Sequence, residues 1–204
     1  MKITRYFQSC LLIEEGGARI LIDPSGQDKD IEKFGKLDAV FYTHEHGDHF
    51  DADMAKQFVE EGIAPVYANA STAKHVEASK TEVADGQEFE IKGVKIKSIE
   101  LPHCLMVDGS EGPQNTGYLI NNRLFHPGDG KELEGLNAEV LAMPLSGPDI
   151  SPHDGFMFAK QVQAKTVIPI HYDYLGGNPD FFASIAEKNG IKTHVLQKSQ
   201  SVEL

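Results

Sequence analysis

The sequence has few cysteines, few basic residues and no long apolar run, and it lacks tryptophan altogether. Its two cysteines, Cys10 and Cys104, stand far apart in a chain of 204 residues, so we expect reduced thiols rather than a disulfide framework. A membrane span needs about 20 apolar residues, and no run approaches that length. Glu14 and Glu15 interrupt the first apolar stretch too early for the core of a signal peptide. We therefore expect a cytoplasmic protein without a membrane partner.

Acidic residues outnumber basic ones, since 31 Asp and Glu face 19 Lys and Arg and leave a formal net charge of −12. A surface of this charge repels polyanions, which disfavours a nucleic-acid partner and favours a small-molecule substrate. An anionic substrate would need a local positive centre. The chain is long enough to bury a core, and it shows no repeat, low-complexity tract or linker. We therefore expect a single domain over residues 1–204, of unspecified oligomeric state.

Short β-branched and aromatic runs between turn residues predict strands that alternate with helices. We expect strands at residues 2–7, 10–14, 18–22, 38–42, 65–68, 88–91, 94–100, 116–120, 124–126, 140–144, 166–170 and 193–196. Capping residues predict helices at about 51–61, 71–79, 151–164 and 178–190. Asn121 and Asn122 should turn a hairpin, and the turn-rich stretch 104–115 should form a loop beside a pocket.

A dense cluster of metal-binding side chains follows the strand predicted at 38–42. It places three imidazoles, His44, His46 and His49, and the carboxylate of Asp48 within six residues. Imidazole nitrogens bind zinc, iron, nickel and copper, and a carboxylate also suits manganese. In an extended segment His44 and His46 point to the same side and can hold one ion. If the chain then bends into the next helix, Asp48 and His49 turn toward a neighbouring position, and one loop serves two ions.

Three further candidates stand at the ends of predicted strands, namely His103, Asp129 and His171. Alone, each is as well explained by a surface residue or by a hydrogen-bonded residue of the core. A motif gains weight from its context, and here the cluster at 44–49 supplies that context. The combination therefore predicts a metal centre built from several loops.

The pattern His-x-His-x-Asp-His at 44–49, followed by His, Asp and His on later loops, resembles the metallo-β-lactamase-fold hydrolase superfamily. The compact length and the motifs at 127–129 and 168–172 are most similar to its small lactonase-like and uncharacterised metal-dependent hydrolases. The resemblance implies an α/β fold, an αββα sandwich of two mixed β-sheets flanked by helices, with the site at one edge. It also implies two sets of metal ligands bridged by Asp129: His44, His46 and His103 for one ion, and Asp48, His49 and His171 for the other.

The activity implied by this resemblance is hydrolysis of an ester-type bond, in a lactone or a phosphoester. Two divalent ions, Zn²⁺ in the first place and Mn²⁺, Fe²⁺ or Ni²⁺ otherwise, would share a hydroxide, lower its pKa and stabilise charge on the attacked group. Asp48 would be the catalytic side chain that orients this hydroxide or receives its proton. The substrate would be a small molecule, and the positive charge of the ions would admit an anionic one.

Two alternatives from other classes remain open. The fold can keep its metals and serve as a sensor or binding module without turnover, because metal binding alone does not establish catalysis. It can also host a mononuclear iron dioxygenase of the persulfide type. A true β-lactamase is disfavoured, because such enzymes usually replace the bridging acid by Cys or Ser, whereas this chain has Asp129.

Asp23, just after the strand predicted at 18–22, has no evident place among the ligands. We expect it either to accept a hydrogen bond from a ligating imidazole or its loop, or to form a turn before Pro24. The lactonase-like relatives often carry Gly-His-Ser near the first turn, whereas this chain has Phe7, Gln8 and Ser9. Any role of that histidine is therefore absent here.

The remaining acidic and histidine candidates are weaker. Glu45 should face away from its two neighbouring ligands. His126 and His153 could approach the site as substrate-binding or supporting groups, whereas His75 and His194 are expected at the surface.

Overall fold

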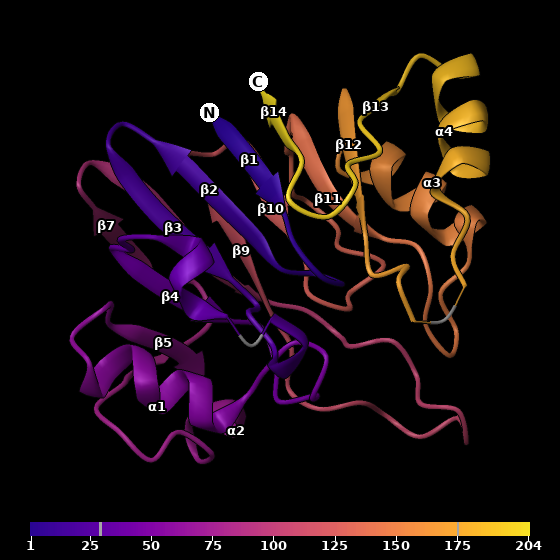
Figure 1. Ribbon diagram of the computed structural model, residues 1–204. Helices are drawn as coiled ribbons and strands as arrows, with labels where there is room; N and C mark the ends of the chain where they lie inside the picture. The colour runs from indigo at the N-terminus through magenta and orange to yellow at the C-terminus, as the bar shows by residue number, and fades with distance from the viewer. Residues whose placement is uncertain (29, 175) are drawn as a thin grey trace.

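In the computed structural model, which describes residues 1–28, 30–174 and 176–204, two seven-stranded sheets face each other with helices on the outer sides (Figure 1). This is the predicted αββα sandwich of two mixed β-sheets. The first sheet has the order β14-β1-β2-β3-β4-β5-β6 and the second β13-β12-β11-β10-β9-β8-β7. Each sheet combines antiparallel and parallel pairs.

The first sheet begins with an antiparallel meander and continues with parallel strands that are linked by helical segments. Its strands are β1 (Lys2–Arg5), β2 (Leu11–Glu15), β3 (Ala18–Ile22), β4 (Ala39–Tyr42), β5 (Val66–Asn69), β6 (Thr81–Val83) and β14 (Ser201–Glu203). The helical segments are two 3₁₀ turns, η1 (Gly26–Asp28) and η2 (Ile31–Phe34), and the helices α1 (Ala52–Glu60) and α2 (Ala70–Ala73). Asp51 caps α1 by accepting a hydrogen bond from the Met54 N–H at 2.8 Å, as the sequence predicts.

The second sheet carries α3 (Pro152–Gln161) and α4 (Pro179–Lys188) on its outer side. Its strands are β7 (Glu88–Ile91), β8 (Val94–Glu100), β9 (Thr116–Ile120), β10 (Leu124–His126), β11 (Val140–Pro144), β12 (Thr166–Ile170) and β13 (Lys192–Thr193). Asn121 and Asn122 both adopt positive φ, of 50° and 52°, between β9 and β10. Such a turn suits the twist of a tight hairpin, which confirms the predicted connection.

Three apolar clusters hold the layers together. The cluster between the sheets joins Ile3, Ile20 and Phe41 of the first sheet to Tyr118 and Ile168 of the second. A second cluster packs α1 and η2 on the first sheet, and a third packs α3 and α4 on the second sheet. Because each sheet buries both faces, its central strands are apolar throughout rather than alternating.

The structure departs from the sequence prediction at short or peripheral elements. The helix expected at 71–79 is the four-residue α2, after which Val76 is buried against the first sheet and the chain enters β6. The strand expected at 193–196 ends at Thr193 as β13. There the Leu196 carbonyl accepts hydrogen bonds from the side chains of Arg5 and Tyr172 rather than from a strand. β6 and β14 are not anticipated by the sequence pattern.

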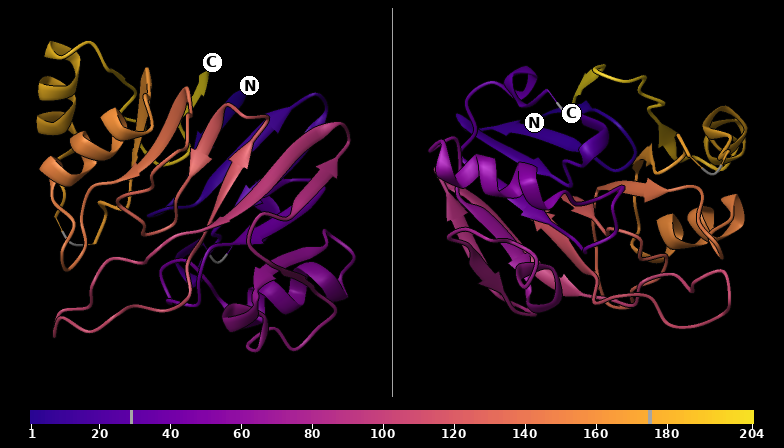
Figure 2. Two further views of the ribbon diagram at one scale, coloured as in Figure 1. Left: turned by 180° about the vertical axis from the view of Figure 1, so that it is seen from behind. Right: turned by 60° about the horizontal axis from the view of Figure 1, so that its bottom comes forward.

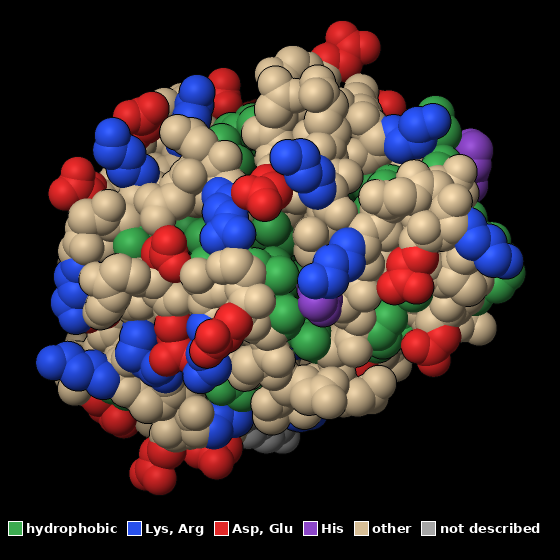
Figure 3. Space-filling model, turned by 90° about the horizontal axis from the view of Figure 1, so that it is seen from above, with side chains coloured by type: hydrophobic (Ala, Val, Ile, Leu, Met, Phe, Trp, Pro, Cys, Tyr) green, Lys and Arg blue, Asp and Glu red, His purple; other side chains and the backbone are tan. Residues whose placement is uncertain are grey.

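The two termini lie together at one end of the sandwich (Figure 1), where the Met1 amino group donates to the Leu204 carbonyl at 2.9 Å. Basic and acidic side chains are interspersed over the face seen from this end (Figure 3). At the opposite end, the segment between β8 and β9 extends as a long loop beyond the body of the molecule (Figure 2). In the described part of the chain, no helix is both long and apolar enough to cross a membrane.

Candidate metal centre

The predicted ligands meet at the end of the sandwich away from the termini. His44–His49 follows β4, His103 follows β8, Asp129 follows β10 and His171 follows β12. The loop 43–50 stays compact because the N–H groups of His49 and Phe50 both donate to the His46 carbonyl at 2.9 Å. This bend leaves the rings of His44 and His49 close together, with their centroids 4.0 Å apart.

The seven side chains form two groups, and within each group one nitrogen or oxygen atom of every residue lies within 4.8 Å of those of the other members. The larger group is His44, His46, His103 and Asp129, and the smaller is Asp48, His49 and His171. Asp129 joins the two groups. Its Oδ2 atom lies 3.5 Å from His103 Nε2 in the larger group and 3.4 Å from His171 Nε2 in the smaller. Its Oδ1 atom lies 3.1 Å from His49 Nε2. This is the division that the resemblance implies.

Asp129 reaches this central position because of the turn that follows β10. Gly128 has a φ of 60°, and a Cβ at this residue would overlap the side-chain oxygen of Asn115. Asn115 in turn donates to the Pro127 carbonyl at 2.9 Å and accepts from the Asp129 N–H at 3.3 Å. Glycine is therefore required by both conformation and space at the residue before the central carboxylate.

Hydrogen bonds at Nδ1 orient four of the imidazoles. His103 and His171 donate from Nδ1 to the carbonyls of Cys104 and Ser146, each at 2.6 Å, and His49 donates to Asp23 at 2.8 Å. The Thr43 hydroxyl already donates to Asp23, so at 3.0 Å it accepts from His44 Nδ1. A neutral imidazole that carries its proton on Nδ1 presents the Nε2 lone pair.

These Nε2 atoms face the centre of the cluster. Those of His44 and His103 are buried and have no hydrogen-bond partner among the described residues, and the buried Nε2 of His49 has only Asp129 Oδ1, at 3.1 Å, beside it. Buried polar atoms without partners are costly, so their convergence needs an explanation. A divalent cation satisfies them, because nitrogen and carboxylate oxygen are ligands of zinc and related metals. The residues present therefore fit the metal that the sequence resemblance implies.

Charge pairing within the cluster shifts the pKa values of its members. Complete burial lowers the pKa of His44. Burial opposes protonation of His49 as well, but the neighbouring carboxylates of Asp129 and Asp23 raise its pKa well above the usual range. Burial raises the pKa of Asp48, but the hydrogen bond from His171 and the charge of His49 outweigh it and lower that pKa. Asp48 is therefore ionised near neutral pH.

Asp23 supports the loop rather than forming an isolated turn. It is completely buried and accepts from the Thr43 N–H at 2.8 Å, from the Thr43 hydroxyl at 2.7 Å and from His49 Nδ1 at 2.8 Å. Of the two predicted roles, the structure bears out contact with a candidate ligand and its loop.

The other candidates lie outside the cluster. Glu45 turns away from it and accepts from the Ser71 hydroxyl at 2.6 Å, as expected for a structural residue. His126 is buried behind the site, where its ring bonds to the Ser9 carbonyl at 2.8 Å. His153 is exposed on the first turn of α3 and belongs to neither group, so the possible approach of His153 to the site gains no support. His75 is exposed as expected, and His194 is half-buried.

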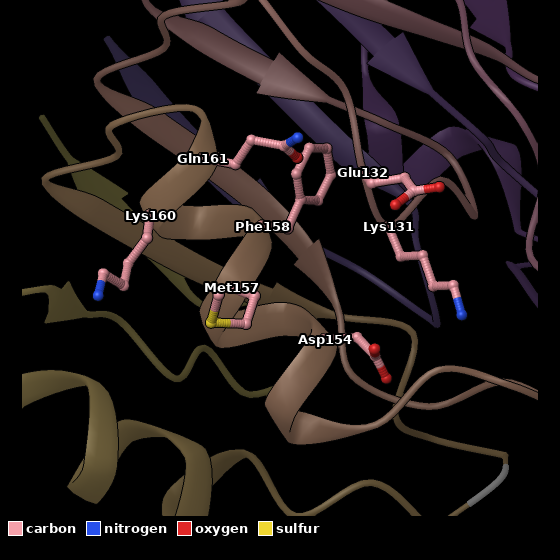
Figure 4. Close-up of a pocket in the computed structure, with 7 residues that line it drawn as sticks. All are labelled: Lys131, Glu132, Asp154, Met157, Phe158, Lys160 and Gln161. Carbon is pink, nitrogen blue, oxygen red and sulfur yellow. The ribbon is translucent and has the colours of Figure 1, made fainter.

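Two hollows lie near these loops. A groove of about 810 Å³ runs beside His103 and is flanked by the acidic residues Asp85, Glu100 and Glu111. Another, of about 450 Å³, lies between α3 and the segment that carries Lys131 (Figure 4). Its lining includes none of the seven candidate ligands, and the Lys131 amine is bonded to Asp149 at 2.8 Å. The groove at His103 therefore adjoins the candidate metal centre.

Comparison with known proteins agrees with this geometry. Residues 2–171 match the family model described as the beta-lactamase superfamily domain. The chain belongs to the β-lactamase superfamily. Among relatives, it is 31% identical to a UPF0173 protein of Pyrococcus furiosus, with 94% of this chain and 93% of the relative covered. It is 23% identical to a UPF0173 metal-dependent hydrolase of Thermus thermophilus, with 96% of each chain covered.

A solved structure shares the fold. Igni18, a metallo hydrolase from Ignicoccus hospitalis, superposes with a TM-score of 0.77 at 19% sequence identity, over 100% of this chain and 98% of that chain. The superfamily membership and the shared fold thus confirm the resemblance drawn from residues 44–49, 103, 129 and 171.

Proposed function

We propose that this member of the β-lactamase superfamily is a metal-dependent hydrolase that cleaves an ester-type bond at a centre of two divalent ions. The observation that carries the proposal is the convergence of the buried Nε2 atoms of His44, His49 and His103 on the carboxylate of Asp129. The printed names of relatives with similar length, among them a metal-dependent hydrolase, support the reaction class.

The two groups of side chains suggest how the ions would be held. His44, His46 and His103 would hold one, and Asp48, His49 and His171 the other. Asp129 would bridge them, which its short distances to members of both groups support. The ligands are nitrogen and oxygen atoms, so we expect Zn²⁺ first, with Mn²⁺, Fe²⁺ and Ni²⁺ as competitors.

Two divalent ions at such a centre lower the pKa of a water molecule and stabilise the charge that develops on the attacked group. The protein would supply the proton acceptor. Asp48 is suited to this role because its side chain is 26% exposed, against 5% for Asp129. It can accept a proton from the attacking water and return it to the leaving oxygen.

The surroundings of the centre favour a neutral carboxylic ester or lactone. The groove beside His103 has carboxylates at Asp85, Glu100 and Glu111, and no Lys or Arg is among its lining residues. Negative side chains raise the cost of bringing in an anionic group. A phosphodiester is the second candidate, because two ions can clamp the attacking and the leaving oxygen of such a substrate.

The test compares hydrolysis of a simple lactone and a chromogenic phosphodiester by protein loaded with zinc or manganese. Asp48→Asn is the blank, and Asp53→Asn on the exposed face of α1 is the matched control. We expect faster lactone hydrolysis by the wild type and by Asp53→Asn, and at least a hundredfold lower rate for Asp48→Asn.

Absence of turnover on both substrates would contradict the proposal for ester bonds. Metal binding without any hydrolysis would favour a sensor or binding module. Oxygen consumption with a thiol substrate and one bound iron would favour the dioxygenase alternative.

A further inference from the structure

Gln8 lies in the turn between β1 and β2, next to the smaller group of candidate ligands. It is completely buried, and its backbone adopts a φ of 51°, an uncommon conformation for a residue other than glycine. Strained backbone of this kind persists where the surrounding structure imposes it, and it is concentrated at functional sites. His171 has the same feature, with a φ of 55°.

The backbone of Gln8 is bonded to the loop that follows β12. Its carbonyl accepts a hydrogen bond from the His171 N–H at 3.1 Å, and its own N–H donates to the Asp173 carboxylate at 2.6 Å. The same Asp173 carboxylate pairs with the buried guanidinium of Arg5 at the end of β1. Arg5 and Gln8 thereby join the first strand and the turn after it to the loop that carries His171.

The side-chain amide of Gln8 spans the remaining distance to Asp48. Its Oε1 atom accepts from the N–H groups of Asp173 at 2.8 Å and Tyr174 at 3.3 Å. Its Nε2 atom donates to Asp48 Oδ2 at 3.1 Å. The oxygen that accepts this bond is also 3.1 Å from His171 Nε2. One amide therefore contacts the carboxylate of one candidate ligand and the loop that carries another.

We propose that Gln8 is a positioning residue that fixes the Asp48 carboxylate relative to His171, so that the smaller group of ligands is set before an ion binds. An amide is suited to this position because it donates at one end and accepts at the other. Groups that orient ligands in this way typically change metal affinity by about 10–100-fold when they are removed. The inference rests on the proposed function, because it takes Asp48 and His171 as ligands of one ion.

To test this, metal-free protein is titrated with Co²⁺. The visible absorption spectrum is recorded, and the affinity for each ion is measured by calorimetry. Gln8→Met retains the length of the side chain but removes its hydrogen bonds at both ends. We expect one ion to bind within about threefold of its wild-type affinity and the other to bind about 10–100-fold more weakly, with a changed spectrum at the second equivalent. Wild-type affinities with the wild-type spectrum would overturn the proposal.

Two further variants separate positioning from other effects. Gln57→Glu on α1 is the matched control, because the Gln57 amide also donates to a carboxylate, that of Glu61, at 2.8 Å. It should bind both ions as the wild type does. If Gln8→Met does not fold, Gln8→Glu provides the test. Its carboxylate can still accept hydrogen bonds from the N–H groups of Asp173 and Tyr174, but it cannot donate one to Asp48. Its spectrum at the second equivalent should change, and an unchanged spectrum would overturn the proposal.

Failure of this inference is distinguishable from failure of the proposed function. A wild-type protein that hydrolyses nothing, together with weakened binding by Gln8→Met, would leave Gln8 as a positioning residue and reject the hydrolase. A wild-type protein that binds a single ion would reject the dinuclear centre. In that case weaker binding of this ion by Gln8→Met would support the role of Gln8, and equal binding would overturn it.

Discussion

Asp23→Asn is expected to weaken metal binding although Asp23 belongs to neither group of candidate ligands. In the structure, Asp23 Oδ1 accepts from the Thr43 N–H, and Oδ2 accepts from the Thr43 hydroxyl and from His49 Nδ1. An asparagine that keeps its oxygen toward the Thr43 N–H presents an NH₂ group to His49. The imidazole then favours the tautomer that is protonated on Nε2, the atom that faces Asp129.

The magnitude follows from these contacts. Loss of a partner that orients a ligating histidine lowers metal affinity by about 10–100-fold, or about 1.4–2.7 kcal/mol. The metal-free protein also loses a hydrogen bond to a buried charge, which lowers the free energy of unfolding by about 1.5–3 kcal/mol. Calorimetric titration with Zn²⁺ measures the first effect, and denaturant unfolding of the metal-free protein measures the second.

Asp38→Asn is the control for this prediction. Asp38 also accepts from a backbone N–H, that of Arg19 at 2.9 Å, and it pairs with Lys92 at 2.7 Å on the surface. This variant should lose some stability but bind Zn²⁺ with unchanged affinity. Unchanged affinity in Asp23→Asn as well would show that Asp23 does not set the tautomer of His49.

Three further predictions concern the same centre. Gly128→Ala should lower the free energy of unfolding by more than 1 kcal/mol in denaturant titration, because Gly128 has a φ of 60° and its Cβ would overlap Asn115; a wild-type midpoint would contradict this. Removal of zinc by a chelator should lower stability by about 4 kcal/mol if the protein was held at a thousand times the Kd, which calorimetric melting detects as a lower Tm; an unchanged Tm would contradict it. Zinc affinity should rise with pH and continue to rise above pH 6.5, because neighbouring carboxylates raise the pKa values of His49 and His171 and protons compete with the ion until both rings are neutral; calorimetry that shows constant affinity above pH 6.5 would exclude this competition.

Much of the fold is predictable because the central strands are apolar and bounded by turn residues. β3, β9, β11 and β12 have the predicted limits, and each is largely or wholly buried. β6 and β14 are three residues long and largely exposed, so their sequences carry no periodic signal. They are strands because the edges of the sheet offer them hydrogen-bond partners. The pairing of β14 with β1 therefore depends on residues that are far apart in the sequence.

The candidate site shows the same contrast. His44, His46 and His49 stand close together in the sequence, and their chemistry marks them directly. Gln8 carries no such mark, because glutamine is seldom a metal ligand and its contacts join residues separated by 40 and 165 positions. The one signal in the sequence is that Gln8 stands where the lactonase-like relatives often have the histidine of Gly-His-Ser.

A count of bound ions tests whether the seven candidate ligands, from His44 to His171, hold two ions. Metal-free protein is loaded with zinc, passed through a desalting column and analysed for zinc and protein content. We expect two zinc ions per chain in the wild type and one in His171→Ala, which removes a member of the smaller group. Fewer than two ions in the wild type, or two in His171→Ala, would contradict this expectation.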